Sequence, residues 1–212
     1  MDAMKRSGGQ YKLFETGAEL PIGFRYRPDF ITEDEEELLL SFIAAQDMKR
    51  VSGGQGDRYR GKRHYKHFGW WYDEKNARFV IGPALPKFLR RFARRIEKWL
   101  ALPRGRVAEA LINEYPNGYG IGWHQDKEPF AHVVGISLAG WSTMRLRKSP
   151  ARTASRRASP VESLELEPRS VYVLEGPSRT DYQHSIAPTR TLRYSITFRT
   201  LPKNIRVPPL RK

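Results

Sequence analysis

The residues best suited to chemistry lie in segment 120–126, where His124 and Asp126 stand two positions apart. In an extended segment, residues i and i+2 project to the same side, so the two side chains can converge on one point. His184, at the start of an expected late strand, offers a second imidazole. Two imidazoles and one carboxylate on one side of a metal, with open positions opposite, are typical of non-haem Fe(II) oxygenases. The chain has no cysteine, which excludes disulfides, thiolate-bound zinc, iron–sulfur clusters and thiol nucleophiles.

The last expected strand, 192–200, has one polar and one apolar face, and its polar face carries Arg193 and Arg199. Along an ideal strand their Cα atoms are roughly 20 Å apart. Guanidinium groups reaching inward from both ends would then leave a gap of about 7 Å, which fits a five-carbon dicarboxylate. The forked donors of arginine suit carboxylate capture better than lysine does. The alternative interpretation is a strand face exposed to solvent.

Asn113 and Tyr115 are also two positions apart, on a strand expected just before the His124–Asp126 pair. An amide and a phenol that face inward would hydrogen-bond the same small acid. The alternative is that both are ordinary residues of a sheet.

Two helices and a run of short strands must position these residues. Thr32 and Glu35 form a capping-box pattern that predicts a helix over 32–46, and apolar residues at helical spacing predict another over 86–100. Beyond about residue 107 the hydrophobic period is two, which predicts strands at 108–115, 132–139, 142–148, 162–167, 170–175, 183–186 and 192–200. This order favours a mainly β (α+β) fold, a double-stranded β-helix or jelly-roll core with N-terminal helices packed outside.

Charge is the main compositional signal, because the chain of 212 residues has 38 Lys and Arg residues and only 23 Asp and Glu residues. The net charge of +15 predicts attraction to polyanions, with nucleic acid ahead of an anionic membrane surface. The alternative is that the charge serves only solubility. No secretory signal and no membrane-spanning apolar run are recognised, so we expect an intracellular protein, and nothing in the sequence requires more than a monomer.

The chain divides into four expected parts. These are a flexible N-terminal arm (1–20), a helical region (21–106) with a basic lid at about 49–75, a β-core (107–201) with a flexible basic insert (148–161), and a basic tail (202–212). Within the lid, residues 49–67 are rich in glycine and in Lys and Arg, and we expect them to form a mobile loop. The aromatic cluster Trp70, Trp71 and Tyr72 follows; the alternative for these rings is the core of a strand.

Taken in order, these residues resemble the AlkB family of Fe(II)- and 2-oxoglutarate-dependent dioxygenases. The resemblance runs through segment 113–115, the His124–Asp126 pair, His184 and the strand from Arg193 to Arg199. It is strong over about 107–201, moderate over 58–72 and faint before that. One departure is Ser195, where the better-known DNA-repair members carry Asn between the two arginines.

The resemblance implies a role for each of these residues. His124, Asp126 and His184 would be the iron ligands, and Arg193, Asn113 and Tyr115 would hold 2-oxoglutarate, with Arg193 at its distal carboxylate. Arg199 would sit near the carboxylate end that chelates the metal. The implied activity is oxidative dealkylation with Fe(II), 2-oxoglutarate and O₂, which releases formaldehyde from an N-methyl group. Because both imidazoles must be neutral to bind iron, activity should fall at acid pH.

The resemblance also suggests how a substrate is recognised. Glu128 resembles an acidic residue that contacts the target base, and Trp70, Trp71 and Tyr72 resemble the end of a nucleotide-recognition lid. Their rings would stack on an extruded base. The neighbouring cations would neutralise phosphates; they are Arg58, Arg60, Lys62 and Arg63.

Three functions remain open at this point. The first is a demethylase of N-alkylated bases in single-stranded or locally opened nucleic acid, DNA or RNA. The second is the same oxygenase acting on a methylated protein side chain, with Glu128 facing the cation. The third is a catalytically silent β domain that binds nucleic acid.

Overall fold

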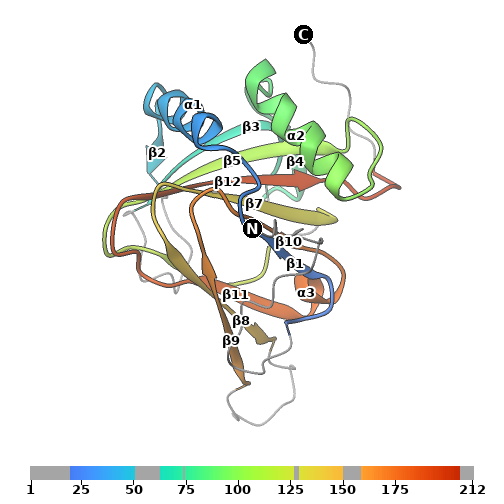
Figure 1. Cartoon of the computed structure of the whole chain (residues 1–212). Helices are drawn as coiled ribbons and strands as arrows, with labels where there is room; N and C mark the ends of the chain where they lie inside the picture. The colour runs from blue at the N-terminus through green and yellow to red at the C-terminus, as the bar shows by residue number, and fades with distance from the viewer. Residues whose placement is uncertain (1–19, 51–62, 74, 127–128, 150–158, 206–212) are drawn as a thin grey trace, which may run out of the picture.

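The computed structural model describes residues 20–50, 63–73, 75–126, 129–149 and 159–205. These residues form two antiparallel sheets that lie face to face (Figure 1). The larger sheet has the order β1 (Phe24–Arg27), β10 (Val171–Leu174), β7 (His132–Leu138), β12 (Arg193–Thr200), β5 (Val107–Tyr115), β3 (His64–Asp73) and β2 (Lys49–Arg50), and β4 (Arg78–Ile81) pairs with β3. The smaller sheet has the order β6 (Ile121–His124), β11 (Tyr182–Ile186), β8 (Ser142–Lys148) and β9 (Val161–Leu166). The predicted jelly-roll core is confirmed.

Helices α1 (Glu33–Ala44) and α2 (Lys87–Trp99) lie over the outer face of the larger sheet, and a short helix α3 (Pro177–Thr180) precedes β11 (Figure 1). The capping box that predicted α1 is present. The Glu35 backbone N–H donates to the Thr32 hydroxyl at 3.2 Å, and the Thr32 N–H donates to the Glu35 carboxylate at 3.1 Å. These two bonds satisfy backbone donors that an uncapped helix leaves unpaired, which explains why α1 begins where it does.

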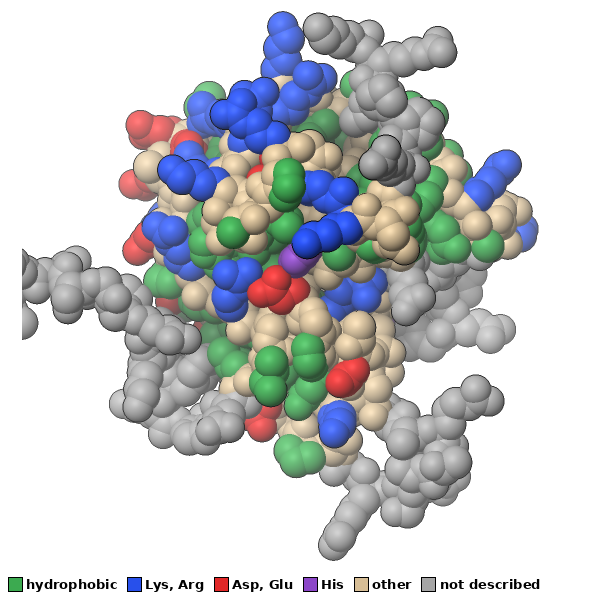
Figure 2. Space-filling model, turned by 90° about the vertical axis from the view of Figure 1, so that its right-hand side faces the viewer, with side chains coloured by type: hydrophobic (Ala, Val, Ile, Leu, Met, Phe, Trp, Pro, Cys, Tyr) green, Lys and Arg blue, Asp and Glu red, His purple; other side chains and the backbone are tan. Residues whose placement is uncertain are grey.

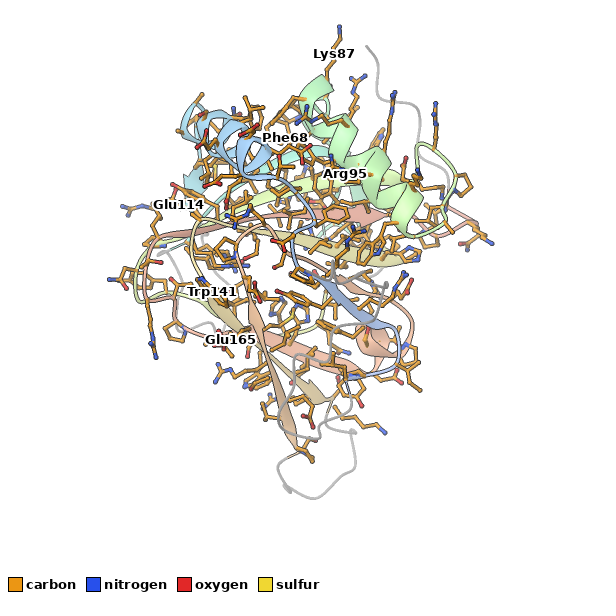
Figure 3. The ribbon with its side chains drawn as sticks, viewed as in Figure 1. Phe68, Lys87, Arg95, Glu114, Trp141 and Glu165 are labelled. Carbon is orange, nitrogen blue, oxygen red and sulfur yellow. The ribbon has the colours of Figure 1, made fainter. Side chains whose placement is uncertain are left out.

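Two apolar clusters hold these layers together. Phe92 and Ile96 of α2 pack with Ile112 and Phe198 between the helices and the larger sheet, and Phe68, labelled in Figure 3, lies in the same cluster under the helices. The second cluster, which includes Val133, Met144, Leu146 and Leu174, fills the space between the two sheets. In β5 and β12 the apolar residues Ile112, Ile196 and Phe198 face the helices, so the residues that alternate with them face the space between the sheets.

The expectation of a loop over residues 49–67 is wrong for the part that the structure describes. We expected a loop over 49–67, but Lys49–Arg50 and His64–Asp73 are paired strands, and β3 runs antiparallel to β5. The pairing satisfies backbone groups of the basic segment, and burial of Phe68 stabilises it. Residues 121–124, expected to be extended but not included among the predicted strands, form strand β6. Residues 51–62 and most of the expected insert, 150–158, lie outside the described residues; the flanks of the insert belong to the antiparallel pair β8–β9.

The surface charge is uneven. Figure 2 shows Lys and Arg side chains gathered at the top of the molecule, over the helical layer. The exposed cations of α2 are Lys87, Arg91, Arg94 and Lys98. Among the helices of the described chain, none is both long and apolar enough to pass through a membrane.

Candidate active site

The inner face of the larger sheet carries the four residues predicted to bind 2-oxoglutarate, in neighbouring cross-strand rows. Arg193 of β12 lies opposite Tyr115 of β5, and Ser195 lies opposite Asn113. Arg199 lies opposite Glu109, four positions before Asn113. Because alternate residues of a strand share a face, this register brings the amide, the phenol and both arginines to the same side.

The His–Asp–His triad comes from the smaller sheet and the segment that leaves it. His124 and His184 are paired in the register of β6 and β11, and their ring centroids are 4.2 Å apart. Asp126 follows β6, and its carboxylate oxygen lies 3.3 Å from His184 Nε2. One ligand atom from each of the three residues lies within 4.8 Å of the others. Gly120 allows β6 to approach β11 closely, since a Cβ there would collide with the Ile186 carbonyl oxygen.

The protonation states of the triad suit a metal ion. Burial, together with the charge of His184, lowers the pKa of His124 from 6.5 to about 4, so its ring is neutral at neutral pH. Its Nδ1 lies 2.9 Å from the Gly122 carbonyl, which leaves Nε2 with a free lone pair. Burial alone would raise the pKa of Asp126, but the charge of Arg199 and the hydrogen bond with His184 hold it well below its usual range. A neutral imidazole and an ionised carboxylate are the forms that bind divalent metals.

Arg193 has the surroundings expected of an anion receptor. It is 1% exposed, its Nε donates to Ser137 Oγ at 3.2 Å, and its guanidinium lies 4.9 Å from the centre of the Tyr115 ring. Its Nη1 is buried and has no hydrogen-bond partner. Within the described chain, no carboxylate pairs with it. A buried cation without a counter-ion is costly, so this environment fits the distal carboxylate of 2-oxoglutarate.

Arg199, the other arginine on this face of β12, has different surroundings. That both arginines face an anionic occupant, with Arg199 near the carboxylate end that chelates the metal, stays a prediction. In the structure Arg199 donates to Glu109 at 3.0 Å and to Asp126 at 2.8 Å. Because two protein carboxylates already neutralise its charge, only Arg193 is left without a counter-ion, and Arg199 contacts the triad directly.

The lid residues divide into three groups. The Trp71 ring stacks on His67 with the ring centroids 5.2 Å apart, whereas Trp70 and Tyr72 pack against a small cluster around Phe130. Arg63 precedes β3; its guanidinium carbon lies 5.9 Å from the centre of the Tyr115 ring, and its Nε and Nη1 are buried without partners. The other predicted substrate residues lie outside the described residues; they are Arg58, Arg60, Lys62 and Glu128.

Sequence reasoning missed three residues around the two arginines of β12. Glu109 contacts Arg199, His67 contacts Glu109, and Ser137 contacts Arg193. Glu109 is 1% exposed and accepts from Arg199, while its other oxygen lies 2.5 Å from His67 Nδ1. One signal could have identified Glu109. It lies an even number of positions from Asn113 and Tyr115 on the expected strand 108–115, so its charged side chain is expected on the same face of the sheet.

Comparisons with known proteins agree with this geometry. A family model described as the 2OG-Fe(II) oxygenase superfamily matches residues 23–199. An Arabidopsis thaliana protein named "Alkylated DNA repair protein ALKBH8 homolog" is 28% identical over 194 residues, which cover 82% of this chain and 53% of that protein. A Danio rerio protein named "Probable RNA/DNA demethylase ALKBH6" is 27% identical over 174 residues, which cover 79% of this chain and 70% of that one.

A solved structure, "The structure of OsALKBH1", shares the fold with a TM-score of 0.62 at 15% identity and covers 86% of this chain and 100% of that chain. The chain spans about half the length of the Arabidopsis relative. The matched residues include both strands of the His–Asp–His triad and the arginine strand β12. The chain belongs to the 2OG-Fe(II) oxygenase superfamily, whose cofactors are Fe(II), 2-oxoglutarate and O₂, and it is AlkB-like.

Proposed function

We propose that this oxygenase demethylates N-alkylated bases in nucleic acid. One arrangement carries the proposal. The triad, the Trp71–His67 stack and Arg193, which has no carboxylate partner among the described residues, lie around one face of the larger sheet. The arrangement offers a metal site, an anion site and a flat aromatic surface close together, and these are the three elements that oxidation of a base requires.

His124, Asp126 and His184 would hold the iron. Bound iron supplies, with 2-oxoglutarate and O₂, the oxidation of an N-alkyl C–H bond, while the co-substrate becomes succinate and CO₂. The chain contributes ligation and orientation: the Gly122 carbonyl fixes the His124 ring, and Arg199 fixes the Asp126 carboxylate. Both contacts leave one ligand atom of each side chain free for the metal.

Arg193, Tyr115 and Asn113 would hold 2-oxoglutarate. The buried guanidinium would pair with the distal carboxylate and thereby gain the counter-ion it lacks among the described residues. Tyr115 is 2% exposed and Asn113 5% exposed, so these polar groups are screened from bulk water. Exclusion of water strengthens the charged hydrogen bonds on which co-substrate orientation depends.

Nucleic acid is the substrate class best supported by the chain. The net charge of +15 attracts polyanions, and a stacked Trp71–His67 pair offers a surface for an extruded base. Arg63, whose guanidinium has two unpaired N–H donors near Tyr115, is placed to contact an anionic or acceptor group that enters the site. The names of the two relatives, an alkylated DNA repair protein and a probable RNA/DNA demethylase, agree with this choice.

The test is turnover of methylated single-stranded DNA and RNA by the purified protein with Fe(II), ascorbate and 2-oxoglutarate. We expect release of formaldehyde and a matching loss of mass from the oligonucleotide. His124→Ala should abolish both, because it removes a metal ligand. His132→Ala is the matched control, since His132 is a half-buried histidine bound to Thr200 and Glu175 rather than to the triad.

The same assay separates the alternatives. Turnover of methylated peptides but of no methylated oligonucleotide would reject nucleic acid as the substrate and support the protein-side-chain oxygenase. Salt-dependent binding of nucleic acid without any consumption of 2-oxoglutarate would reject the enzyme altogether and leave a silent binding domain.

A further inference from the structure

Glu109 lies at the centre of a line of charged groups that begins at the triad. Asp126 Oδ1 accepts from Arg199 Nη2 at 2.8 Å, and Arg199 Nη1 donates to Glu109 Oε2 at 3.0 Å. The other Glu109 oxygen, Oε1, lies 2.5 Å from His67 Nδ1. The line therefore connects the smaller sheet, β12, β5 and β3 through four side chains.

The position of Glu109 makes these contacts obligatory. Its side chain is 2% exposed, so its carboxylate has no access to water that could replace a lost partner. Each of its two oxygens already has one partner, and both partners belong to the surroundings of the triad. A buried carboxylate keeps its charge only while such partners remain.

The formal charges along the line explain what Glu109 contributes. Without it, the single positive charge of Arg199 would neutralise the single negative charge of Asp126. With it, Arg199 is shared between two carboxylates, and the three groups carry a net charge of −1 (from −1, +1 and −1) beside the triad. Glu109 thus preserves the negative charge that attracts a divalent cation to Asp126.

The far end of the line reaches the aromatic pair. His67, which contacts Glu109, stacks on Trp71, with the ring planes 23° apart. A carboxylate partner at Nδ1 limits rotation of the imidazole, so the plane on which Trp71 packs is set from within the sheet. The same carboxylate therefore supports the metal ligand on one side and the stacked pair on the other.

We propose that Glu109 is a positioning residue of the metal centre that keeps Asp126 an effective anionic ligand and joins it to the His67–Trp71 pair. The inference rests on the proposed ligand set, but it does not depend on the identity of the substrate. It can therefore be tested by metal binding alone.

The experiment is titration of the metal-free protein with Co(II), followed by calorimetry and by visible absorption. We expect Glu109→Gln to weaken Co(II) affinity by about tenfold, the lower end of what loss of a residue behind a metal ligand costs. Glu114→Gln is the matched control. Glu114 lies on the same strand and its carboxylate is 3.1 Å from His64 Nδ1, but on the other face of the sheet, so affinity should be unchanged.

A double substitution tests the charge argument itself. In Glu109→Gln/Arg199→Met, neither the shared cation nor the extra carboxylate remains, so Asp126 keeps its full charge but loses the Arg199 contact that fixes it. We therefore expect Co(II) affinity above that of Glu109→Gln and below that of the wild type. If Glu109→Gln does not fold, the double variant is compared with Arg199→Met and should bind Co(II) more weakly, because only Arg199→Met still has the Glu109 carboxylate. His67→Asn keeps an N–H donor next to Glu109 Oε1 but removes the imidazole ring, so it should leave Co(II) affinity unchanged and alter the Trp71 fluorescence.

The possible outcomes are distinct. If His124→Ala fails to weaken Co(II) binding, the proposed ligand set is wrong. If His124→Ala weakens binding while Glu109→Gln stays within twofold of the wild type, the ligand set survives and the role of Glu109 is rejected. A double variant that binds Co(II) no more tightly than Glu109→Gln rejects it as well.

Discussion

Arg193 and Arg199 lie on the same face of β12, yet their guanidinium groups have opposite surroundings. Arg193 is 1% exposed, touches a hydroxyl and an aromatic ring, and keeps one buried N–H without a partner. Arg199 is held by Glu109 and Asp126, and these carboxylates raise its pKa above the usual range although burial alone would lower it. The first arginine has no carboxylate partner among the described residues, whereas the second has two. The alternation of residues along a strand therefore identifies which side chains face a site, but the residues on the neighbouring strands determine which partners each side chain has.

The largest effect should come from Arg193→Met, which removes the guanidinium proposed to bind 2-oxoglutarate. We expect affinity for 2-oxoglutarate to fall about 100- to 1,000-fold, because removing one partner of a buried charged pair costs several kcal/mol. Stability of the ligand-free protein should be unchanged or slightly higher, since a buried cation without a counter-ion is removed. Anaerobic titration of the Mn(II)-loaded protein with 2-oxoglutarate measures the first quantity and urea unfolding the second. Unchanged co-substrate affinity would assign the unpaired guanidinium to some other anion.

Arg199→Met should instead lower the stability of the ligand-free protein. Removing this cation leaves Glu109 and Asp126 buried beside each other without their shared partner, and we expect the free energy of unfolding to drop by about 3–5 kcal/mol. Saturation with Co(II) should restore part of the loss, because a bound cation compensates Asp126. Urea unfolding with and without Co(II) measures both effects. A loss equal to that of Arg193→Met would mean that the two environments do not differ energetically.

The sequence was sufficient for features that depend on neighbouring residues in the chain. Thr32 and Glu35 predicted the start of α1, and strand alternation predicted β5 and β12 and the face they share. It was insufficient for β3, because a segment rich in Gly, Lys and Arg is typical of loops and becomes a strand only by pairing with β5. Long-range pairing is a tertiary property that local propensity does not encode.

The same distinction applies to the candidate site. His124, Asp126 and His184 are recognisable because few residue types bind metals, and the structure brings them together. The difference between the two arginines was not predictable, since it depends on the register that sets Glu109 opposite Arg199. His67 was missed for the same reason, because its contact with Glu109 crosses from β3 to β5.

The stability of the metal-free protein should depend on pH through the protonation of His124. His124 has a pKa of about 4 in the folded chain and about 6.5 when unfolded. Between these values the unfolded chain binds more protons, so stability is greatest above pH 6.5 and decreases as the pH falls toward 4. The ring keeps partial contact with solvent, and we expect a loss of about 1–3 kcal/mol. Urea unfolding across this range, with His124→Gln as the variant that lacks the dependence, tests it; equal slopes would show that another group is responsible.

The smallest effect should come from Arg91 of α2, which shares its partner Glu35 with Arg95, the arginine labelled in Figure 3. Arg91 lies 3.3 Å from Glu35 and its side chain is 48% exposed, so solvent screens the pair. We expect Arg91→Gln to lower the free energy of unfolding by at most about 1 kcal/mol, and added salt should remove the difference. Urea unfolding in low and high salt, run beside Arg199→Met, gives the measurement. If Arg91→Gln costs as much as Arg199→Met, burial is not what separates the contribution of a structural arginine from that of a surface one.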